Sequence, residues 1–281
     1  MIAVTAATGH LGTLVIEEML KSVPADQIVA AVRTPSKAAV FAAKGVQVRE
    51  GDYTRPETFA AALAGVTKLL LISGTDLGHR VPQHKAVIDA AKAAGVQFVA
   101  YTSLLRADTS PLQLAAEHLA TENDLRASGL VFSLLRNGWY FENMTAGIAP
   151  ALAQGAFIGA TKDGRIAAAS RADYAGAAAR VLTTEGHTNS VYELAGDISF
   201  TRAELAAEVS KQTGKVIAYH DLPESEYEKI LATFLPPQLA TILADAEAKA
   251  ADGALDDDSH TLSKLIGRST TTLAAAVAAA L

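Results

Sequence analysis

Short apolar runs alternate with segments of helical periodicity through the first half of this chain. Runs typical of buried strands occupy residues 2–4, 27–33, 46–50, 68–74, 97–103 and 130–136. Between them, apolar residues recur every three or four positions, which places them on one face of a helix. Helices are predicted after residue 9 and at residues 38–43, 58–63, 83–94 and 113–127. This alternation predicts a doubly wound parallel sheet, whose ligands bind at the carboxyl ends of the strands.

The pattern is less regular after residue 137. Short strands are predicted at residues 156–160, 165–168 and 215–219, a further strand of the main sheet at 190–194, and helices at 173–184, at 201–212 and from 223 onward. We therefore expect an α/β protein, with a Rossmann-type doubly wound parallel sheet and a small, mainly helical C-terminal substrate lobe. The sheet domain is expected to comprise residues 1–137 and about 165–195, and the lobe about 138–164 and 196–281.

Composition narrows the class of protein. Half of the 281 residues are hydrophobic, 19% are charged and the net charge is −6, which is ordinary for a globular protein and gives no sign of a nucleic-acid-binding surface. The absence of cysteine excludes disulfides and thiol catalysis. The longest uncharged run, residues 143–161, contains Asn, Gln, Pro and Gly and makes a poor membrane span. We expect a soluble, cytoplasmic protein without a signal peptide.

The first predicted strand leads into a turn of small residues and then a helix. Ala6, Gly9 and Gly12 give the pattern A-x-x-G-x-x-G, with alanine where dinucleotide-binding turns carry their first glycine. Such a turn leaves backbone N–H groups at a helix N-terminus, where the helix dipole favours a pyrophosphate. The residues expected to bind a dinucleotide here are Thr5, Ala6, Ala7, Thr8, Gly9, His10 and Leu11.

Arg33 ends the second predicted strand. An acidic residue near this point binds the ribose of NAD, whereas a basic residue can receive the 2′-phosphate of NADP. Guanidinium matches phosphate with two hydrogen bonds, and residues 32–35 contain no acid. The alternative is a solvated surface arginine. We expect NADPH as the cofactor, with NADH possible but weaker.

Small polar residues end the fourth and fifth predicted strands. Ser73 and Gly74 end the fourth strand, and Thr102 and Ser103 end the fifth. At the edge where a ligand binds, small residues let the backbone approach it, although strands commonly end in such residues for no functional reason. We expect these four residues to bind the cofactor, together with Gln83 at the start of the next helix.

The usual proton donor of short-chain reductases is missing. None of the seven tyrosines has lysine four residues later. The helix after the fifth strand instead carries His118, on the same stripe as Thr121 and Leu125. A histidine on an apolar face is more often a hydrogen-bonded core residue than a catalyst, and both interpretations stay open. The histidines form no metal-binding motif, so no metal is expected.

An aromatic segment follows the sixth predicted strand. It consists of Asn137, Gly138, Trp139 and Tyr140 and includes the only tryptophan. Such a segment can stack on a flat ring or line an apolar pocket. Packing between lobes is the alternative. We expect all four residues near the cofactor.

Several segments together resemble the NmrA-like atypical short-chain dehydrogenase/reductases, and within them the branches that reduce quinones and triphenylmethane dyes. They are residues 4–12, 32–37, 51–53, 71–73, 100–103, 117–118, 134–143 and 261–267. The resemblance implies a Rossmann domain with a small C-terminal lobe, NADPH along residues 5–12 with its 2′-phosphate at Arg33, and residues 137–140 beside nicotinamide and substrate. His118 falls where related isoflavone-reductase-like enzymes place an acid–base lysine. Ala6 departs from the family pattern, and its methyl disfavours positive φ.

These features predict an NADPH-dependent reductase that passes a hydride directly to a quinone-like, electron-poor acceptor without flavin. His118, Asn137 and Tyr140 are the predicted catalytic residues. The alternatives are an NADP(H)-sensing, non-catalytic regulator, or a carbonyl, imine or dye reductase on the same scaffold. The expected partner is a planar small molecule, with neither nucleic acid nor membrane involved, and the protein is expected to be a monomer or homodimer.

Overall fold

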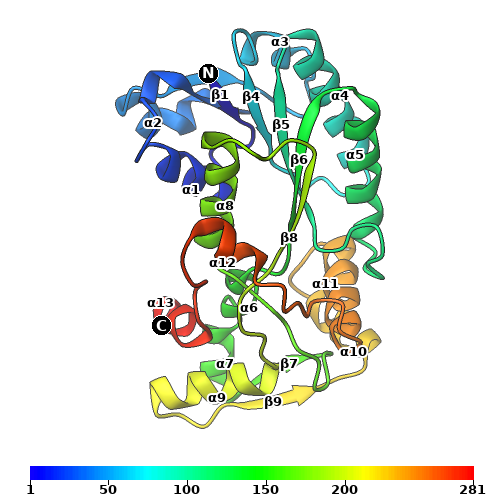
Figure 1. Ribbon diagram of the computed structural model, residues 1–281. Coiled ribbons are helices and arrows are strands. Elements are labelled where there is room, and N and C mark those ends of the chain that lie inside the picture. The colour runs from blue at the N-terminus through cyan, green and yellow to red at the C-terminus, as the bar shows by residue number, and fades with distance from the viewer. The chain divides into compact units, whose positions relative to one another are not determined.

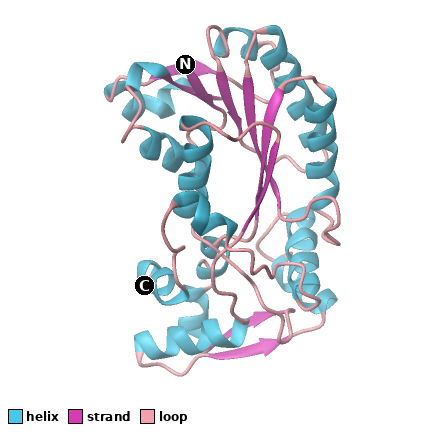
Figure 2. Cartoon of the chain, in the orientation of Figure 1, coloured by secondary structure: helices cyan, strands magenta, loops and turns pink.

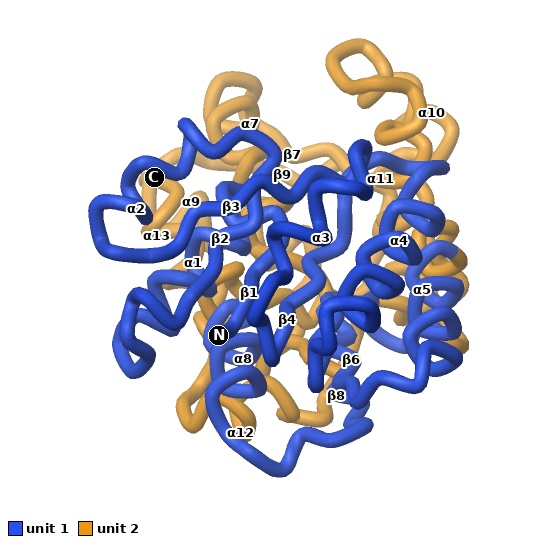
Figure 3. Tube along the Cα trace, turned by 90° about the horizontal axis from the view of Figure 1, so that it is seen from above, with its two compact units in different colours: residues 1–107, 117–137, 174–192 blue, residues 108–116, 138–173, 193–281 orange.

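The computed structural model describes residues 1–281, and the chain forms two compact units, each described by itself (Figure 3). Unit 1 comprises Met1–Ala107, Glu117–Asn137 and Tyr174–Tyr192. Unit 2 comprises Asp108–Ala116, Gly138–Asp173 and Glu193–Leu281.

Unit 1 is built on a seven-stranded sheet of order β3-β2-β1-β4-β5-β6-β8 (Figure 2). Its strands are β1 (Ile2–Val4), β2 (Ile28–Val32), β3 (Gln47–Glu50), β4 (Lys68–Leu71), β5 (Phe98–Leu104), β6 (Val131–Asn137) and β8 (Ser190–Leu194). The pairings among β1 to β6 are parallel, and β1 lies between β2 and β4, with Ile2 opposite both Ile28 and Lys68. The strand order therefore reverses at β1, which is where a doubly wound sheet binds its ligand.

Helices cover both faces of this sheet (Figure 1). They are α1 (His10–Met19), α2 (Ala39–Ala43), α3 (Thr58–Ala62), α4 (Arg80–Ala93), α5 (Ala115–Ala127) and α8 (Arg171–Thr183), with 3₁₀ turns η1 (Ala25–Gln27) and η2 (Pro35–Ala38). On one face, α3, α4 and α5 bury apolar side chains against Leu69, Leu71 and Val99. The central strands are apolar without alternation because neither face meets water, and all five residues of β2 are buried.

Unit 2 is mainly helical and has one small sheet. Its elements are α6 (Phe141–Thr145), α7 (Ile148–Gln154), β7 (Ala156–Gly159), α9 (Arg202–Thr213), β9 (Ala218–Asp221), α10 (Glu224–Leu231), α11 (Pro237–Ala250), α12 (Thr261–Ile266) and α13 (Leu273–Ala280). Strands β7 and β9 pair in parallel. Helix α9 begins with a capping box, in which the Thr201 hydroxyl accepts from the backbone N–H of Glu204 and the Glu204 carboxylate accepts from that of Thr201.

The structure confirms the doubly wound parallel sheet and corrects parts of the later chain. The strand predicted at residues 165–168 is wrong, because its backbone groups bond to separate segments rather than to one neighbour. Ile166 bridges Phe200, whereas the N–H of Ala167 donates to the carbonyl of Leu255. The last strand begins at Ala218 rather than at residue 215. Helix α4 begins before the predicted residue 83, because Pro82 fits in a first helical turn.

None of the helices combines the length and the apolar character needed to cross a lipid bilayer.

Candidate active site

The turn between β1 and α1 is tight and carries local strain. Ala6 has φ 47°, in the left-handed region that glycine adopts without penalty. An L-residue there costs about 1 kcal/mol. The N–H of Gly9 donates to the Ala6 carbonyl at 2.8 Å. A methyl group on Gly12 would lie 2.5 Å from that carbonyl oxygen, so the helix approaches the turn too closely for any side chain at this position.

The first turn of α1 presents backbone donors rather than side chains. No side chain caps the helix at Gly9, and its first turn contains no acidic residue. Thr8, Gly9 and His10 are exposed. Because the first N–H groups of a helix have no partner within it, this end of α1 is suited to an anion.

The other residues predicted along this turn are buried or half-buried. Ala7 and Leu11 are buried in the core, and Ala6 is half-buried. Thr5 is fully buried: its hydroxyl donates to the carbonyl of Leu70 at 3.1 Å and accepts from the N–H of Ile72 at 2.9 Å. The Thr5 side chain therefore ties β1 to β4, and only its backbone lies along the turn.

Arg33 is exposed and follows the last residue of β2. Strand β2 is the parallel neighbour of β1, so Arg33 and the opening turn lie at the same edge of the sheet. Lys37, on η2, is also exposed. A phosphate held at the end of β2 would meet positive charge from both side chains.

On the other side of β1, the backbone after β4 is held by side chains. The N–H of Gly74 donates to His84 Nε2 at 2.9 Å, and Arg80 Nε donates to the Gly74 carbonyl at 2.8 Å. The N–H of Ser73 donates to Thr102 Oγ1 at 2.8 Å. The predicted residues Ser73, Gly74 and Thr102 are thus brought together at one edge of the sheet.

Gln83 lies close to this segment, on the first half of α4. Its Oε1 would lie 3.7 Å from a methyl group added to Gly74, and its Nε2 donates to Asp76 at 2.8 Å. Its side chain is half-buried, so it borders the Gly74 backbone while keeping a partner in the preceding loop.

His84 is fully buried and has a fixed tautomer. Its Nε2 accepts the Gly74 N–H, so its Nδ1 carries the proton and donates to Thr121 Oγ1 at 3.0 Å. The Thr121 hydroxyl donates in turn to the carbonyl of Glu117. Burial, with a smaller contribution from the charge of Arg80, lowers the pKa of His84 from 6.5 to about 3. His84 is therefore neutral at physiological pH.

His118 is also buried, with both ring nitrogens engaged. Nε2 lies 3.3 Å from Arg80 Nη1, which is only a donor, so Nε2 accepts and Nδ1 donates to the Tyr101 hydroxyl at 2.9 Å. Burial, the charge of Arg80 and the nearby His84 hold the pKa of His118 well below its usual value. Arg80 in turn lies 3.4 Å from the carboxylate of Glu117.

Ser103 belongs to a buried ion-pair network. Its hydroxyl donates to Glu122 Oε1 at 2.6 Å, and Arg136 donates to the same carboxylate through Nε at 2.9 Å and Nη2 at 2.7 Å. Glu122 is fully buried. The Ser103 hydroxyl thus already donates its hydrogen bond inside the protein.

The remaining predicted residues continue the chain from β6 into unit 2. Asn137 is the last residue of β6, and its carbonyl accepts the N–H of Leu105. The N–H of Gly138 donates to Leu194 at 2.7 Å. Trp139 is 8% exposed, and the half-buried Tyr140 ring carries the Arg171 guanidinium 5.0 Å from its centre. Arg171 is itself held by Asn143 at 2.9 Å.

Sequence reasoning missed the side chains that hold these segments. Arg80, His84, Tyr101, Glu122 and Arg136 were not among the predicted site residues. Arg136 ends an apolar predicted strand just as Arg33 does, and only the structure shows that Arg136 is buried whereas Arg33 is exposed. The other contacts join positions far apart in the chain, and no local spacing reveals them.

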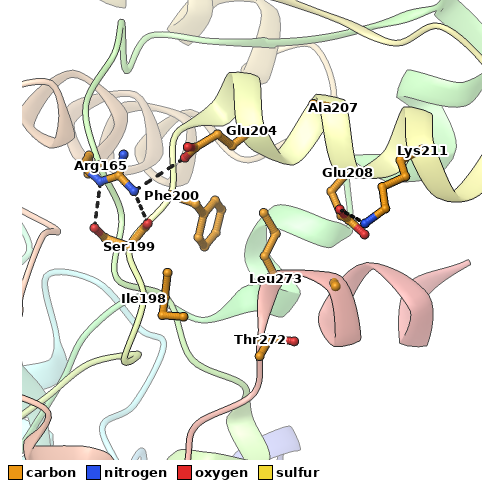
Figure 4. Close-up of a pocket in the computed structure, with 11 residues that line it drawn as sticks. Arg165, Ile198, Ser199, Phe200, Glu204, Ala207, Glu208, Lys211, Thr272 and Leu273 are labelled. Carbon is orange, nitrogen blue, oxygen red and sulfur yellow. Dashed lines mark hydrogen bonds and ion pairs between the residues drawn. The ribbon is translucent and has the colours of Figure 1, made fainter.

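A separate hollow of about 490 Å³ lies on unit 2 (Figure 4). Ile198, Phe200 and Leu273 point into it, and ion pairs between Arg165 and Glu204 and between Glu208 and Lys211 lie beside it. None of the predicted site residues lines this hollow. No group of three or more His, Asp or Glu side chains is placed to hold a metal ion.

A family model covers almost the whole chain. The model of the NmrA-like family matches residues 1–275. The chain belongs to the NmrA-like family. This confirms the resemblance seen in the sequence.

Proteins with stated activities are similar to this chain over almost all of its length. Quinone oxidoreductase 2 of Escherichia coli strain K12 is 57% identical over 278 residues, which are 99% of this chain and 97% of that protein. The crystal structure of an NADPH-dependent quinone oxidoreductase from Escherichia coli, complexed with NADPH, superposes with a TM-score of 0.97 at 56% identity and covers 99% of both chains. Triphenylmethane reductase of Citrobacter sp., complexed with NADP(H), superposes with a TM-score of 0.96 at 40% identity over all of both chains.

Proposed function

We propose that this protein is an NADPH-dependent reductase that transfers a hydride directly to a quinone or a similar electron-poor, planar acceptor. The observation that carries the proposal is the 57% identity to Quinone oxidoreductase 2 across 99% of the chain. The Escherichia coli quinone oxidoreductase structure that superposes with a TM-score of 0.97 at 56% identity is itself an NADPH complex. We propose further that unit 1 holds the cofactor and that unit 2 carries the acceptor-binding residues Trp139 and Tyr140.

The residues of unit 1 fit NADPH. The uncapped N-terminus of α1 offers backbone donors to a pyrophosphate, and the exposed Arg33 offers a guanidinium to a 2′-phosphate. Gly74 leaves space at the end of β4, where a methyl group would meet only Tyr53, Gln83 and His84 at 3.5 to 3.7 Å. NADH lacks the 2′-phosphate, so Arg33 favours NADPH. When bound, the cofactor supplies the hydride.

The protonation states in unit 1 favour an acceptor that needs little acid catalysis. His84 and His118 are neutral with both ring nitrogens engaged, and burial raises the pKa of Tyr101. Loss of a positioned acid costs about 10²–10⁴ in rate for a reaction that must protonate a localised oxyanion. A quinone spreads the negative charge over its ring system and becomes aromatic on reduction. We propose that Asn137 and Tyr140 orient the acceptor, and that His118 acts by holding Tyr101 and Arg80.

A stopped-flow experiment tests the proposal. NADPH and 1,4-benzoquinone are mixed with the enzyme, without added flavin, and NADPH absorbance is followed. We expect oxidation in a single enzyme-dependent phase, slower with NADH at the same concentration. Oxidation no faster than the uncatalysed background would refute the proposal. Tight NADPH binding in a parallel titration, with no turnover, would identify a cofactor sensor instead.

A second acceptor class has support from one comparison. The triphenylmethane reductase of Citrobacter sp. is 40% identical and shares the fold over the whole chain. The same assay with a triphenylmethane dye, followed by loss of dye colour, compares the two classes. A higher kcat/KM for the dye than for every quinone tested would replace the quinone assignment.

A further inference from the structure

The backbone at the end of β4 is held from one side by two side chains of α4. We propose that Arg80 and His84 are positioning residues for the cofactor: they clamp both peptide groups of Gly74 and so fix the segment after β4, against which the cofactor binds. The inference rests on the proposed function. It assigns a role to two residues of α4, outside both the opening turn and the segment of residues 137–140.

The clamp acts on two successive peptide planes. The Gly74 N–H belongs to the peptide before its Cα and donates to His84 Nε2, whereas its carbonyl belongs to the peptide after it and accepts from Arg80 Nε. Glycine has more backbone freedom than any other residue. Two hydrogen bonds of 2.9 and 2.8 Å, one to each plane, remove that freedom at the point where a ligand approaches.

Both clamping side chains are buried and come from one helix face. Arg80 is 5% exposed and His84 is 0% exposed. They lie four residues apart on α4, which places them on the same side of the helix. Because a buried donor or acceptor without a partner costs about 1–3 kcal/mol, each hydrogen bond is strongly favoured over an open alternative.

Helix α5 braces the clamp from behind. Thr121 accepts the Nδ1–H of His84, and Glu117 and His118 both face the Arg80 guanidinium. Thr121 lies four residues after Glu117, so the supporting groups again share a helix face. The position of the Gly74 backbone is thus set by two helices rather than by its own loop. A misplacement of about 1 Å in such a segment can cost a hundredfold in rate, which gives the clamp a functional consequence.

Two substitutions of His84 separate the clamp from general packing. His84→Gln places an amide oxygen where Nε2 stands and keeps an acceptor for the Gly74 N–H. His84→Asn places its amide where Nδ1 stands and keeps only the contact with Thr121. We expect the Kd for NADPH, measured by calorimetric titration at 25 °C, to stay within twofold for His84→Gln and to rise at least tenfold for His84→Asn.

Arg80 offers a matched pair of the same kind. Arg80→Gln keeps an N–H donor at the position of Nε but loses the charge, whereas Arg80→Met fills the same space without a donor. We expect Arg80→Gln to bind NADPH within threefold of wild type and Arg80→Met to bind at least tenfold more weakly.

Hydrogen exchange of the Gly74 amide in the full-length protein without cofactor should be faster in His84→Asn than in His84→Gln.

The outcomes are separable from failure of the proposed function. If wild-type protein does not bind NADPH, the proposed function fails first, and amide exchange at Gly74 still tests the clamp. If both members of a pair weaken binding equally, while their melting temperatures fall equally, the residues are merely structural and the inference is overturned. If neither member changes the Kd by more than twofold, the Gly74 backbone does not position the cofactor and the inference is again overturned.

Discussion

The two sides of β1 are prepared for a ligand in different ways. On the β1–β2 side, the opening turn and Arg33 are exposed, and binding capacity lies in backbone N–H groups and a solvated cation. On the β4–β5 side, the Gly74 backbone and the hydroxyls of Thr102 and Ser103 already have partners inside the protein. The exposed donors of the β1–β2 side can bind charged groups, whereas the β4–β5 side offers a fixed surface. The substitutions below should affect the two sides in different ways.

The largest effect on stability is expected at Gly12. A methyl group there would lie 2.5 Å from the Ala6 carbonyl oxygen and 2.8 Å from the Ala7 Cα, both of which are backbone atoms. Gly12→Ala should therefore lower the free energy of unfolding by about 3 kcal/mol, the upper end of the cost of overpacking. Urea denaturation measures this change. Gly9→Ala is the control, because its methyl would lie 3.1 Å from one atom only, and it should cost less. Equal stability of Gly12→Ala and wild type would contradict the close approach of α1.

The next largest effect is expected at Arg33, and it should appear in affinity alone. Arg33→Asp removes a charge-assisted pair with the 2′-phosphate and adds repulsion, so the Kd for NADPH should rise about 100-fold. The Kd for NADH should change by less than about threefold, which corresponds to 0.6 kcal/mol. Fluorescence titration with each cofactor measures both. Equal weakening of the two cofactors would show that Arg33 does not contact the 2′-phosphate.

The contrast between the sides also explains what the sequence could predict. The β1–β2 side depends on small residues and a basic residue at fixed offsets from a strand, so Gly9, Gly12 and Arg33 stand out without a structure. The strand–helix rhythm predicted the sheet for the same reason, since periodicity is local. The strand predicted at residues 165–168 does not form because its backbone partners lie apart in the chain, at Gly196, Phe200 and Leu255.

The β4–β5 side could not be predicted in this way. Ser73, Gly74 and Thr102 were found as strand ends, but the residues that hold them come from α4 and α5. The pairing of His84 with Gly74 depends on how α4 packs on the sheet, which a spacing of ten residues does not reveal. His118 was identified from its apolar stripe, yet its tautomer follows from Arg80 and Tyr101, 38 and 17 residues away in the chain.

Gly74→Ala tests the β4–β5 side. Gly74 does not have positive φ, and an added methyl would make only ordinary contacts of 3.5 to 3.7 Å within the protein. The variant should therefore be as stable as wild type or slightly more stable, because alanine restricts the unfolded chain. Its affinity for NADPH should fall about tenfold if the cofactor lies against this backbone, which corresponds to about 1.4 kcal/mol. Unchanged affinity would place the cofactor away from Gly74.

Acid should weaken the fold through the buried histidines of the β4–β5 side. The pKa of His84 is about 3 in the folded protein and 6.5 in the reference state, so unfolding takes up a proton between these values. The free energy of unfolding should then fall as the pH is lowered from 6.5 towards 3, by about 1.4 kcal/mol per pH unit for this group. Urea denaturation from pH 7 to 4.5 measures the slope, and His84→Gln should reduce it. An identical slope in His84→Gln would show that His84 does not titrate in this way.

The smallest effect is expected at Ala6, where the β1–β2 side carries its strain. Ala6→Gly relieves a left-handed backbone at φ 47°, which should raise the free energy of unfolding by about 1 kcal/mol, less the entropy that glycine adds to the unfolded chain. If the methyl also crowds the cofactor, the Kd for NADPH should fall by about threefold to fivefold, within about 1 kcal/mol. Denaturation and titration of the same preparation separate the two effects. Higher stability with an unchanged Kd would show that Ala6 strains only the turn itself. Strain that is the same in the free and the bound protein does not change the free energy of binding. Lower stability would contradict the left-handed conformation, since only a residue held at positive φ gains from losing its side chain.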